Sequence, residues 1–280
     1  MSGEKVSVPQ IRAQKVSSGQ PPIAMITAYD APGARIADAS GVDVILVGDS
    51  LAMVVLGYDD TLSVTIQDMA YHSAAVARTK PRALIVTDMP WLSYHTGPFD
   101  AVINGAKLIR SGAEAVKLEG GRNRLEAVKA LVDSEIPVMG HLGLTPQSVH
   151  AFGGYSMQAK TKEAAKRMLE DAVELQNAGV FSIVLEAVPQ VVAQVATKVL
   201  SIPTIGIGAG LDCDGQVLVF HDLLGLSFGH KPKFVRRYAN LAEESVKAIE
   251  SYVHDVKMRQ FPSAEETYHF NQAEFSDFTF

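Results

Sequence analysis

The sequence predicts an α/β domain in which parallel strands alternate with helices. Eight short runs of β-branched and aliphatic residues recur along the 280-residue chain, each bounded by turn residues. Amphipathic helical stretches lie between most of them, and this order is typical of a parallel sheet covered by helices. Eight such units in one chain favour a closed (β/α)8 TIM barrel over an open, doubly wound sheet.

The predicted strands, in chain order, are IAMIT (23–27), VILVG (44–48), ALIVT (83–87), AVKL (115–118), VMGH (138–141), SIVLE (182–186), TIGIG (204–208) and QVLVF (216–220). Only a handful of residues separate the last two, fewer than the roughly ten to twelve that a crossover normally needs. The segment 213–222 could therefore be helical instead, which would leave seven strands.

Helices are expected near 8–17 before the first strand, over 162–178, and near 237–258 after the last strand. Local signals agree with the helical pattern: Thr65 with Asp68 resembles a capping box, and Thr161 can cap the 162–178 helix. Glycines that can end helices stand at positions 41, 112 and 179.

The chain is expected to form one catalytic barrel domain over 1–260, with a C-terminal tail over 261–280 that is rich in Phe, Glu and Ser. Two interpretations of this tail stay open, disorder and docking on a neighbouring subunit.

Composition excludes several classes of protein. With 47% hydrophobic and 20% charged residues the chain is globular, and 25 basic against 31 acidic residues give −6, which does not attract nucleic acid or anionic lipid. A lone cysteine, Cys213, excludes an internal disulfide and a multi-cysteine zinc site. The polar N-terminus lacks a signal peptide, and no apolar stretch reaches about 18 residues. We therefore expect a cytoplasmic protein without a membrane partner.

An acidic residue ends, or directly follows, four of the predicted strands: Asp49, Asp88, Glu119 and Glu186. In a barrel the carboxyl ends of all strands open on one face, so these side chains should converge there. Crowded carboxylates repel one another, and a divalent cation relieves that repulsion. Oxygen ligands favour Mg²⁺ or Mn²⁺ over zinc. Each acid taken singly could instead cap the following helix.

Three further residues lie at the same predicted face. Lys117 comes two residues before Glu119, so both point to one side of the strand. It could bind a substrate carboxylate or enolate oxygen, or pair with Glu119. Ser50 could donate to a bound carboxylate or cap a helix, and His141 could be a donor in the mouth or a buried structural residue.

The other motifs give weaker indications of the protein's function. GIGAG (206–210) follows a late strand, where it could bind phosphate or allow close packing. There is no nucleophile elbow and no evident histidine partner for Cys213, so covalent catalysis has little support.

Several motifs occur in order and at matching spacing: VGDS, TDMPW, VKLEGG, GHLGLTPQ, LEAVP, IGIGAG and CDGQVLVFHDLLG. Through them the chain, from about residue 6 to 258, closely resembles the ketopantoate (3-methyl-2-oxobutanoate) hydroxymethyltransferase family of pantothenate biosynthesis. The resemblance implies a (β/α)8 barrel, a Mg²⁺ ion, 5,10-methylenetetrahydrofolate as co-substrate, and a homo-oligomer, possibly a decamer. The implied reaction converts 3-methyl-2-oxobutanoate into 2-dehydropantoate and releases tetrahydrofolate.

The resemblance also implies roles for the residues that match. Asp49 and Asp88 would bind the metal and through it the keto acid, and Glu119 would complete the magnesium site through water. Ser50 and Lys117 would hold the keto acid, with His141 beside them, and Glu186 would be the catalytic acid/base. A keto acid chelated to magnesium has an acidified C3–H, and the resulting enolate would attack the one-carbon unit.

Two alternatives remain. A lyase or mutase of the isocitrate lyase/phosphoenolpyruvate mutase group would use the same metal enolate, but those enzymes carry a reactive cysteine in a KKCGH-like loop that this sequence lacks. A binding protein without catalysis is disfavoured because all four acids and Lys117 are retained.

Overall fold

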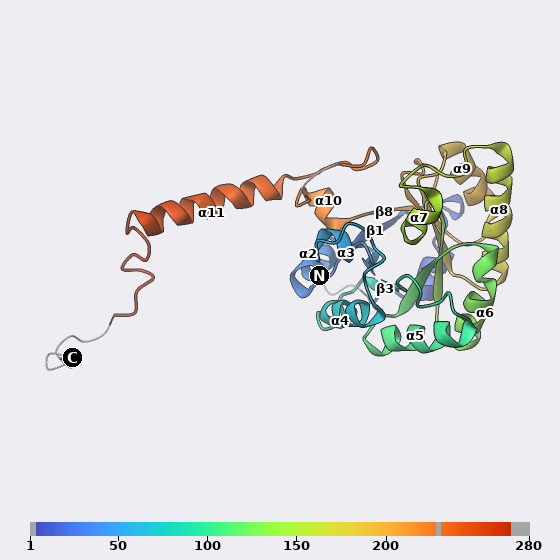
Figure 1. Ribbon diagram of the computed structural model, residues 1–280, viewed down its shortest axis with the longest axis horizontal. Helices are drawn as coiled ribbons and strands as arrows, with labels where there is room; N and C mark the ends of the chain where they lie inside the picture. Colours follow the sequence, from blue (N-terminus) through green and yellow to red (C-terminus); the bar gives the residue numbers. More distant parts are fainter. Residues whose placement is uncertain (1–3, 228–230, 270–280) are drawn as a thin grey trace.

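A computed structural model of the chain describes residues 4–227 and 231–269. Eight parallel strands close into a barrel in sequence order, which confirms the predicted fold class (Figure 1). The strands are β1 (Ile23–Thr27), β2 (Val44–Val47), β3 (Leu84–Asp88), β4 (Ala115–Glu119), β5 (Val138–Gly143), β6 (Ser182–Glu186), β7 (Thr204–Ile207) and β8 (Gly215–Leu218).

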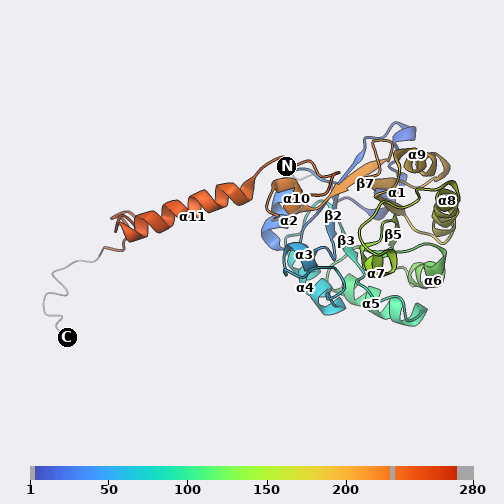
Figure 2. The same cartoon turned by 45° about the horizontal axis from the view of Figure 1, so that its top comes forward.

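All of the described helices except α11 lie around or at an end of this barrel, as Figure 2 shows most clearly. The helices are α1 (Val8–Ala13), α2 (Ala31–Ala39), α3 (Leu51–Val54), α4 (Ile66–Ala77), α5 (Pro98–Arg110), α6 (Leu125–Asp133), α7 (Val149–Phe152), α8 (Lys162–Asn177), α9 (Gln190–Val199), α10 (Phe220–Leu224) and α11 (Leu241–Lys257). The expected helix at 8–17 is shorter, because α1 ends at Ala13 and a 3₁₀ turn follows over Val16–Ser18.

Local signals in the sequence set several helix boundaries. Thr65 and Asp68 form the predicted capping box of α4, and the Thr161 side chain accepts a hydrogen bond from the backbone of Ala164 to begin α8. Gly112 follows α5 with a φ of 101°, a left-handed conformation that costs glycine little.

Successive side chains along each strand point alternately into and out of the barrel, and this produces two apolar layers. In β2, Val44 and Leu46 belong to the cluster inside the barrel, whereas Ile45 and Val47 pack outward against the helices. Ile11 of α1 joins the inner cluster and is fully buried. The N-terminal segment therefore closes one end of the barrel, and the carboxyl ends of the strands remain for the site.

The least certain part of the predicted fold was the closure of the barrel at β8. Residues 208–214 connect β7 to β8 without a helix, yet β8 pairs with β7 and also with β1. The segment 213–222 is thus divided, since its first part supplies β8 and its end begins α10 at Phe220. The seven-strand alternative was wrong.

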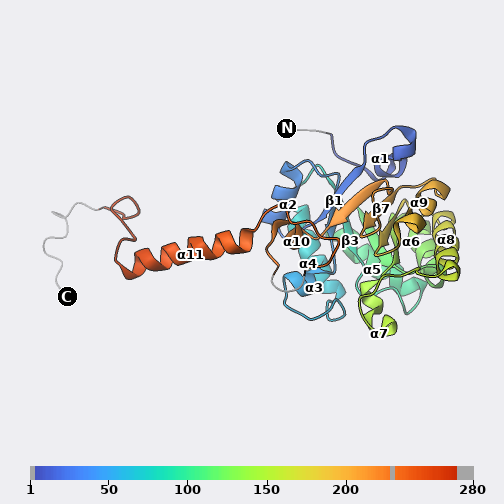
Figure 3. The same ribbon diagram turned by 90° about the horizontal axis from the view of Figure 1, so that it is seen from above.

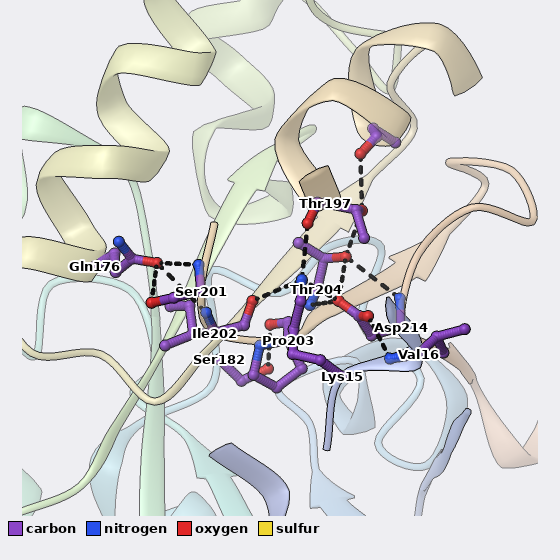
Figure 4. Close-up of polar contacts among 11 residues, drawn as sticks. Lys15, Val16, Gln176, Ser182, Thr197, Ser201, Ile202, Pro203, Thr204 and Asp214 are labelled. Atoms are coloured by element: carbon purple, nitrogen blue, oxygen red, sulfur yellow. Dashed lines mark hydrogen bonds and ion pairs between the residues drawn. The ribbon is translucent and has the colours of Figure 1, made fainter. Parts of the chain in front are cut away.

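A buried polar cluster holds this short connection (Figure 4). The carboxylate of Asp214, which is fully buried, accepts hydrogen bonds from the backbone N–H groups of Val16 and Thr204. Lys15 Nζ lies 2.8 Å from Asp214 Oδ2 and also donates to the backbone carbonyl of Thr197. These contacts tie the N-terminal segment to the β7–β8 connection across 199 residues of sequence.

We expect Asp214→Ala to destabilise the fold strongly. The substitution leaves the buried ammonium of Lys15 without a counter-ion and two backbone donors without a partner, which costs about 3–5 kcal/mol of unfolding free energy. Urea unfolding measures the difference. Lys166→Gln, which breaks an exposed i,i+4 contact with Glu170 on α8, is the control and should change little. A loss no larger than that of the control would contradict a stabilising role for the cluster.

Helix α11 stands away from the barrel in all three views (Figures 1, 2 and 3). It begins at Leu241, later than the expected 237, and none of its residues is buried. Among the described residues, no helix has the length and apolar character needed to cross a membrane. Residues 261–269 are exposed and form no helix or strand, and 270–280 lie outside the described residues, so the docking of the tail stays a prediction, as does the domain boundary at 260.

Candidate active site

A cavity of about 880 Å³ opens at the carboxyl ends of the strands. It is lined by all seven residues that the sequence singled out: Asp49, Ser50, Asp88, Lys117, Glu119, His141 and Glu186. The predicted convergence of these side chains is therefore confirmed, whereas their chemical roles remain predictions.

Strand register explains why these side chains meet. Asp88 of β3 is the register partner of Lys117 on β4, and Glu119 is the partner of His141 on β5. Glu186 ends β6, the next strand. Residues in register on neighbouring parallel strands point to the same side of the sheet, here the inside of the barrel.

Lys117 pairs with Asp88, which corrects the sequence-based alternative that paired it with Glu119. Its Nζ lies 2.7 Å from Asp88 Oδ1, and both side chains are buried. The other oxygen of Asp88 accepts a hydrogen bond of 3.1 Å from the backbone N–H of Asp49. A Cβ at position 48 would lie only 2.9 Å from Ser50 Oγ, so the glycine at this position leaves room for the Ser50 side chain.

The buried charges shift the pKa values of the group. Burial, and then the carboxylates of Asp88 and Glu119, raise the pKa of Asp49 well above its usual range. Burial also raises the pKa of Asp88, although Lys117 opposes the shift. For Lys117 the effect of burial is to lower the pKa, but the surrounding carboxylates outweigh it and the net shift is upward. The cluster holds its ammonium ion firmly and favours additional positive charge.

Gln147 is a part of the site that the sequence analysis missed. Its side-chain Nε2 donates to Asp49 Oδ2 at 2.8 Å, and its backbone N–H donates to Glu119 Oε2 at 3.0 Å. Tyr94 donates its hydroxyl to Gln147 Oε1 at 2.6 Å and so fixes the amide orientation. The GHLGLTPQ motif contains this residue, but the residue types in the motif mark only His141 as a candidate.

His141 connects two parts of the site. Its Nδ1 lies 3.4 Å from Glu119 Oε1, and its Nε2 lies 3.3 Å from Glu186 Oε2. Burial and nearby Lys117 lower its pKa, but the two carboxylates outweigh them and raise it to about 9. The imidazole is buried and also forms part of the cavity wall, and its role as a donor to a bound molecule stays a prediction.

Ser50 precedes the short helix α3, but its side chain makes no capping hydrogen bond. Its hydroxyl instead shares a hydrogen bond of 2.8 Å with the hydroxyl of Tyr29. Ser50 also lines the cavity, and its contact with a substrate stays a prediction.

The family model described as ketopantoate hydroxymethyltransferase matches residues 5–264. The chain belongs to the ketopantoate hydroxymethyltransferase family. A relative in Bradyrhizobium diazoefficiens, named 3-methyl-2-oxobutanoate hydroxymethyltransferase 2, is 53% identical over 265 residues, covering 95% of this chain and 90% of its own. A protein of Clostridium botulinum, named 3-methyl-2-oxobutanoate hydroxymethyltransferase, is 53% identical over 253 residues, with coverage of 90% and 92%.

Solved structures extend the fold comparison beyond the ketopantoate hydroxymethyltransferase family. A phosphonopyruvate hydrolase in complex with oxalate and Mg²⁺ superposes with a TM-score of 0.60 at 12% identity, covering 96% of this chain and 94% of its own. A 2,3-dimethylmalate lyase of the PEP mutase/isocitrate lyase superfamily gives 0.58 at 16% identity, with coverage of 98% and 95%. At these identities the likeness establishes a shared fold.

Proposed function

We propose that the protein transfers a hydroxymethyl group from 5,10-methylenetetrahydrofolate to 3-methyl-2-oxobutanoate in pantothenate biosynthesis. Water is consumed, and the products are 2-dehydropantoate and tetrahydrofolate. The observation that carries this proposal is the high identity to relatives of that name over nearly the whole chain. The convergence of Asp49, Asp88 and Lys117 in one cavity gives it a chemical basis.

The donor set fits a hard divalent cation, and we propose Mg²⁺. Asp49 and Asp88 are buried carboxylates with raised pKa values, and both line the cavity within one cluster of oxygen donors. We assign these two residues as direct ligands and Glu119 as the residue that completes the site. A bound Mg²⁺ would act as a Lewis acid toward the keto acid and make its C3–H more acidic.

Lys117 and Ser50 supply hydrogen-bond donors for the keto acid, and His141 lines the cavity beside them. Lys117 brings a permanent positive charge to the cavity floor, where the substrate carboxylate needs a counter-ion. The branched aliphatic end of the substrate can pack against the apolar part of the wall, which is formed by Leu46, Val184, Ile207 and Val217.

Glu186 is the proposed acid/base. Its side chain is 15% exposed, which makes it more accessible than the buried carboxylate of Asp88, and it contacts His141 rather than Lys117. It therefore lies outside the Asp49–Asp88 group while still facing the cavity. Such a carboxylate can accept a proton from C3 or deliver one to the folate nitrogen.

Cys213 argues against the lyase or mutase alternative. Those enzymes need a reactive thiol in the mouth, whereas Cys213 is buried beside β8 and is not among the residues that line the cavity. Burial also raises the pKa of its thiol, so the nucleophilic thiolate is disfavoured.

A free, buried thiol also supports our inference of a cytoplasmic protein.

The function is tested by supplying 3-methyl-2-oxobutanoate, 5,10-methylenetetrahydrofolate and Mg²⁺ and measuring 2-dehydropantoate by mass spectrometry. We expect product formation that needs all three components. Turnover of a phosphonate, an isocitrate-like acid or oxaloacetate in place of this reaction would overturn the assignment.

We also propose that the protein is a homo-oligomer held partly by α11. Val246, Ile249, Val253 and Val256 are spaced by three and four residues, which places them on one side of the helix, and each is 39–61% exposed. The stripe is left exposed in the described chain, and we infer that a second copy of the chain covers it. A size of ten subunits stays a prediction.

Replacing Val246 and Val253 together by glutamate is expected to dissociate this assembly. Light scattering coupled to size-exclusion chromatography should show a multiple of the 30.1 kDa chain for the unchanged protein and a smaller species for the variant. Ser251→Glu, five positions after Val246 and off the apolar stripe, is the control. A monomeric starting protein, or an unchanged mass in the variant, would refute the proposal.

A further inference from the structure

Residues 231–237 (KPKFVRR) carry four cations in seven positions, on a chain whose net charge is −6. We call Lys231, Lys233, Arg236 and Arg237 the basic rim. All four side chains are exposed, and within residues 4–227 and 231–269 none of them takes part in an ion pair. Neither the keto acid nor the metal accounts for this charge.

The basic rim adjoins the active-site cavity. Lys233 itself lines the cavity, together with Pro232 and Phe234. The Arg237 guanidinium lies 3.5 Å from the carbonyl oxygen of Ser227, another lining residue. Two of the four cations are therefore placed at the mouth by direct contacts.

The segment that carries the rim is anchored to the barrel. The ring of Phe234 packs so closely on Gly208 that a Cβ there would lie 2.9 Å from it. Gly208 belongs to the GIGAG motif, whose role the sequence left open between phosphate binding and close packing. Val235 is buried, and its N–H donates to the carbonyl of Pro232 at 3.0 Å. The cations are thus presented from a defined turn.

Charge is distributed unevenly along the cavity. Six carboxylates line it: Asp49, Asp59, Asp88, Glu119, Glu186 and Asp222. Of the two lining lysines, Lys117 is paired with Asp88 at the floor, and Lys233 lies at the rim. Asp59 is exposed at the cavity as well, but the four cations of the basic rim outnumber it, so a long substrate with one anionic end would bind with that end at the rim and its uncharged end inward.

We propose that the basic rim binds the glutamyl carboxylates of the folate donor, an inference that rests on the proposed function. Lys233 and Arg237 make the main contacts, assisted by Lys231 and Arg236. The one-carbon end of this donor must reach the keto acid at the floor, and its glutamyl end carries all of its carboxylates. The rim thereby orients the donor and favours forms with several glutamyl residues over the monoglutamate.

The test compares the unchanged protein with Lys233→Gln/Arg237→Gln, using 5,10-methylenetetrahydrofolate as the mono- and tetraglutamate and a 5,10-methylenetetrahydropteroate that lacks glutamate. We expect the double variant to raise KM for the tetraglutamate roughly three- to tenfold, with kcat and the KM of the keto acid nearly unchanged. Added salt should shrink the difference, because exposed charges are screened. Calorimetric binding of tetrahydrofolate tetraglutamate gives a readout independent of turnover.

Lys198→Gln on α9, an exposed lysine that does not line the cavity, is the matched control and should match the unchanged protein. The proposal is overturned if the variant keeps the unchanged KM for the tetraglutamate, or if the glutamate-free donor is affected equally. Absence of activity with every donor in the unchanged protein would instead refute the proposed function.

Discussion

Asp88→Ala is expected to reduce the affinity for Mg²⁺ by at least about 100-fold and to weaken keto-acid binding with it. The substitution removes one of two proposed direct ligands, and it leaves the buried ammonium of Lys117 without its partner at 2.7 Å. That ammonium then repels a cation from the same place. Calorimetric titration with Mg²⁺, followed by titration with 3-methyl-2-oxobutanoate in its presence, measures both effects.

Two controls separate metal binding from stability. An unpaired buried charge destabilises a fold, so thermal unfolding of Asp88→Ala and of the isosteric Asp88→Asn shows how much of each variant is folded under assay conditions. Asp59→Asn removes an exposed carboxylate that lines the same cavity, and its Mg²⁺ affinity should be unchanged. If Asp88→Asn is folded and binds Mg²⁺ and the keto acid like the unchanged protein, the ligand assignment is wrong.

The strands could be predicted because short β-branched runs between turn residues leave few alternatives in an alternating α/β chain. Closure of the barrel at β8 was predicted with a helical alternative beside it. Its stability depends on Asp214 contacting Lys15, which is 199 residues away, and on pairing with β1. Local sequence around residues 213–222 contains neither contact, so a helix remained an alternative to the eighth strand there.

The acidic residues at the site could be predicted because the ends of parallel strands meet at one face. The partner of Lys117 could not, because it depends on the register between β3 and β4 rather than on spacing within β4. Gln147 escaped notice for another reason. An amide does not titrate and follows its strand by several residues, and only its contacts with Asp49 and Glu119 reveal its place.

Glu186→Gln is expected to lower kcat by roughly 10²–10⁴-fold while leaving the binding of Mg²⁺ and the keto acid nearly intact. Glutamine keeps the shape of the side chain, but it cannot accept or deliver the proton. Glu186 contacts His141 at 3.3 Å and is separate from the Asp88–Lys117 pair, so its loss should not disturb the metal ligands. Glu170→Gln, on the exposed face of α8, is the control and should retain full activity.

Exchange of the C3 proton of 3-methyl-2-oxobutanoate with deuterated solvent, followed by NMR without folate, identifies the proton that Glu186 handles. If exchange stops in Glu186→Gln, the carboxylate removes the proton from C3, at the end of the substrate next to the metal. If exchange persists while the overall transfer stops, Glu186 acts on the folate side by protonating the departing nitrogen. Both outcomes require intact Mg²⁺ binding, because Lys117 and Asp88 hold their positions without Glu186. A collapse of Mg²⁺ affinity in this variant would instead make Glu186 a ligand and contradict the separation of roles between β3 and β6.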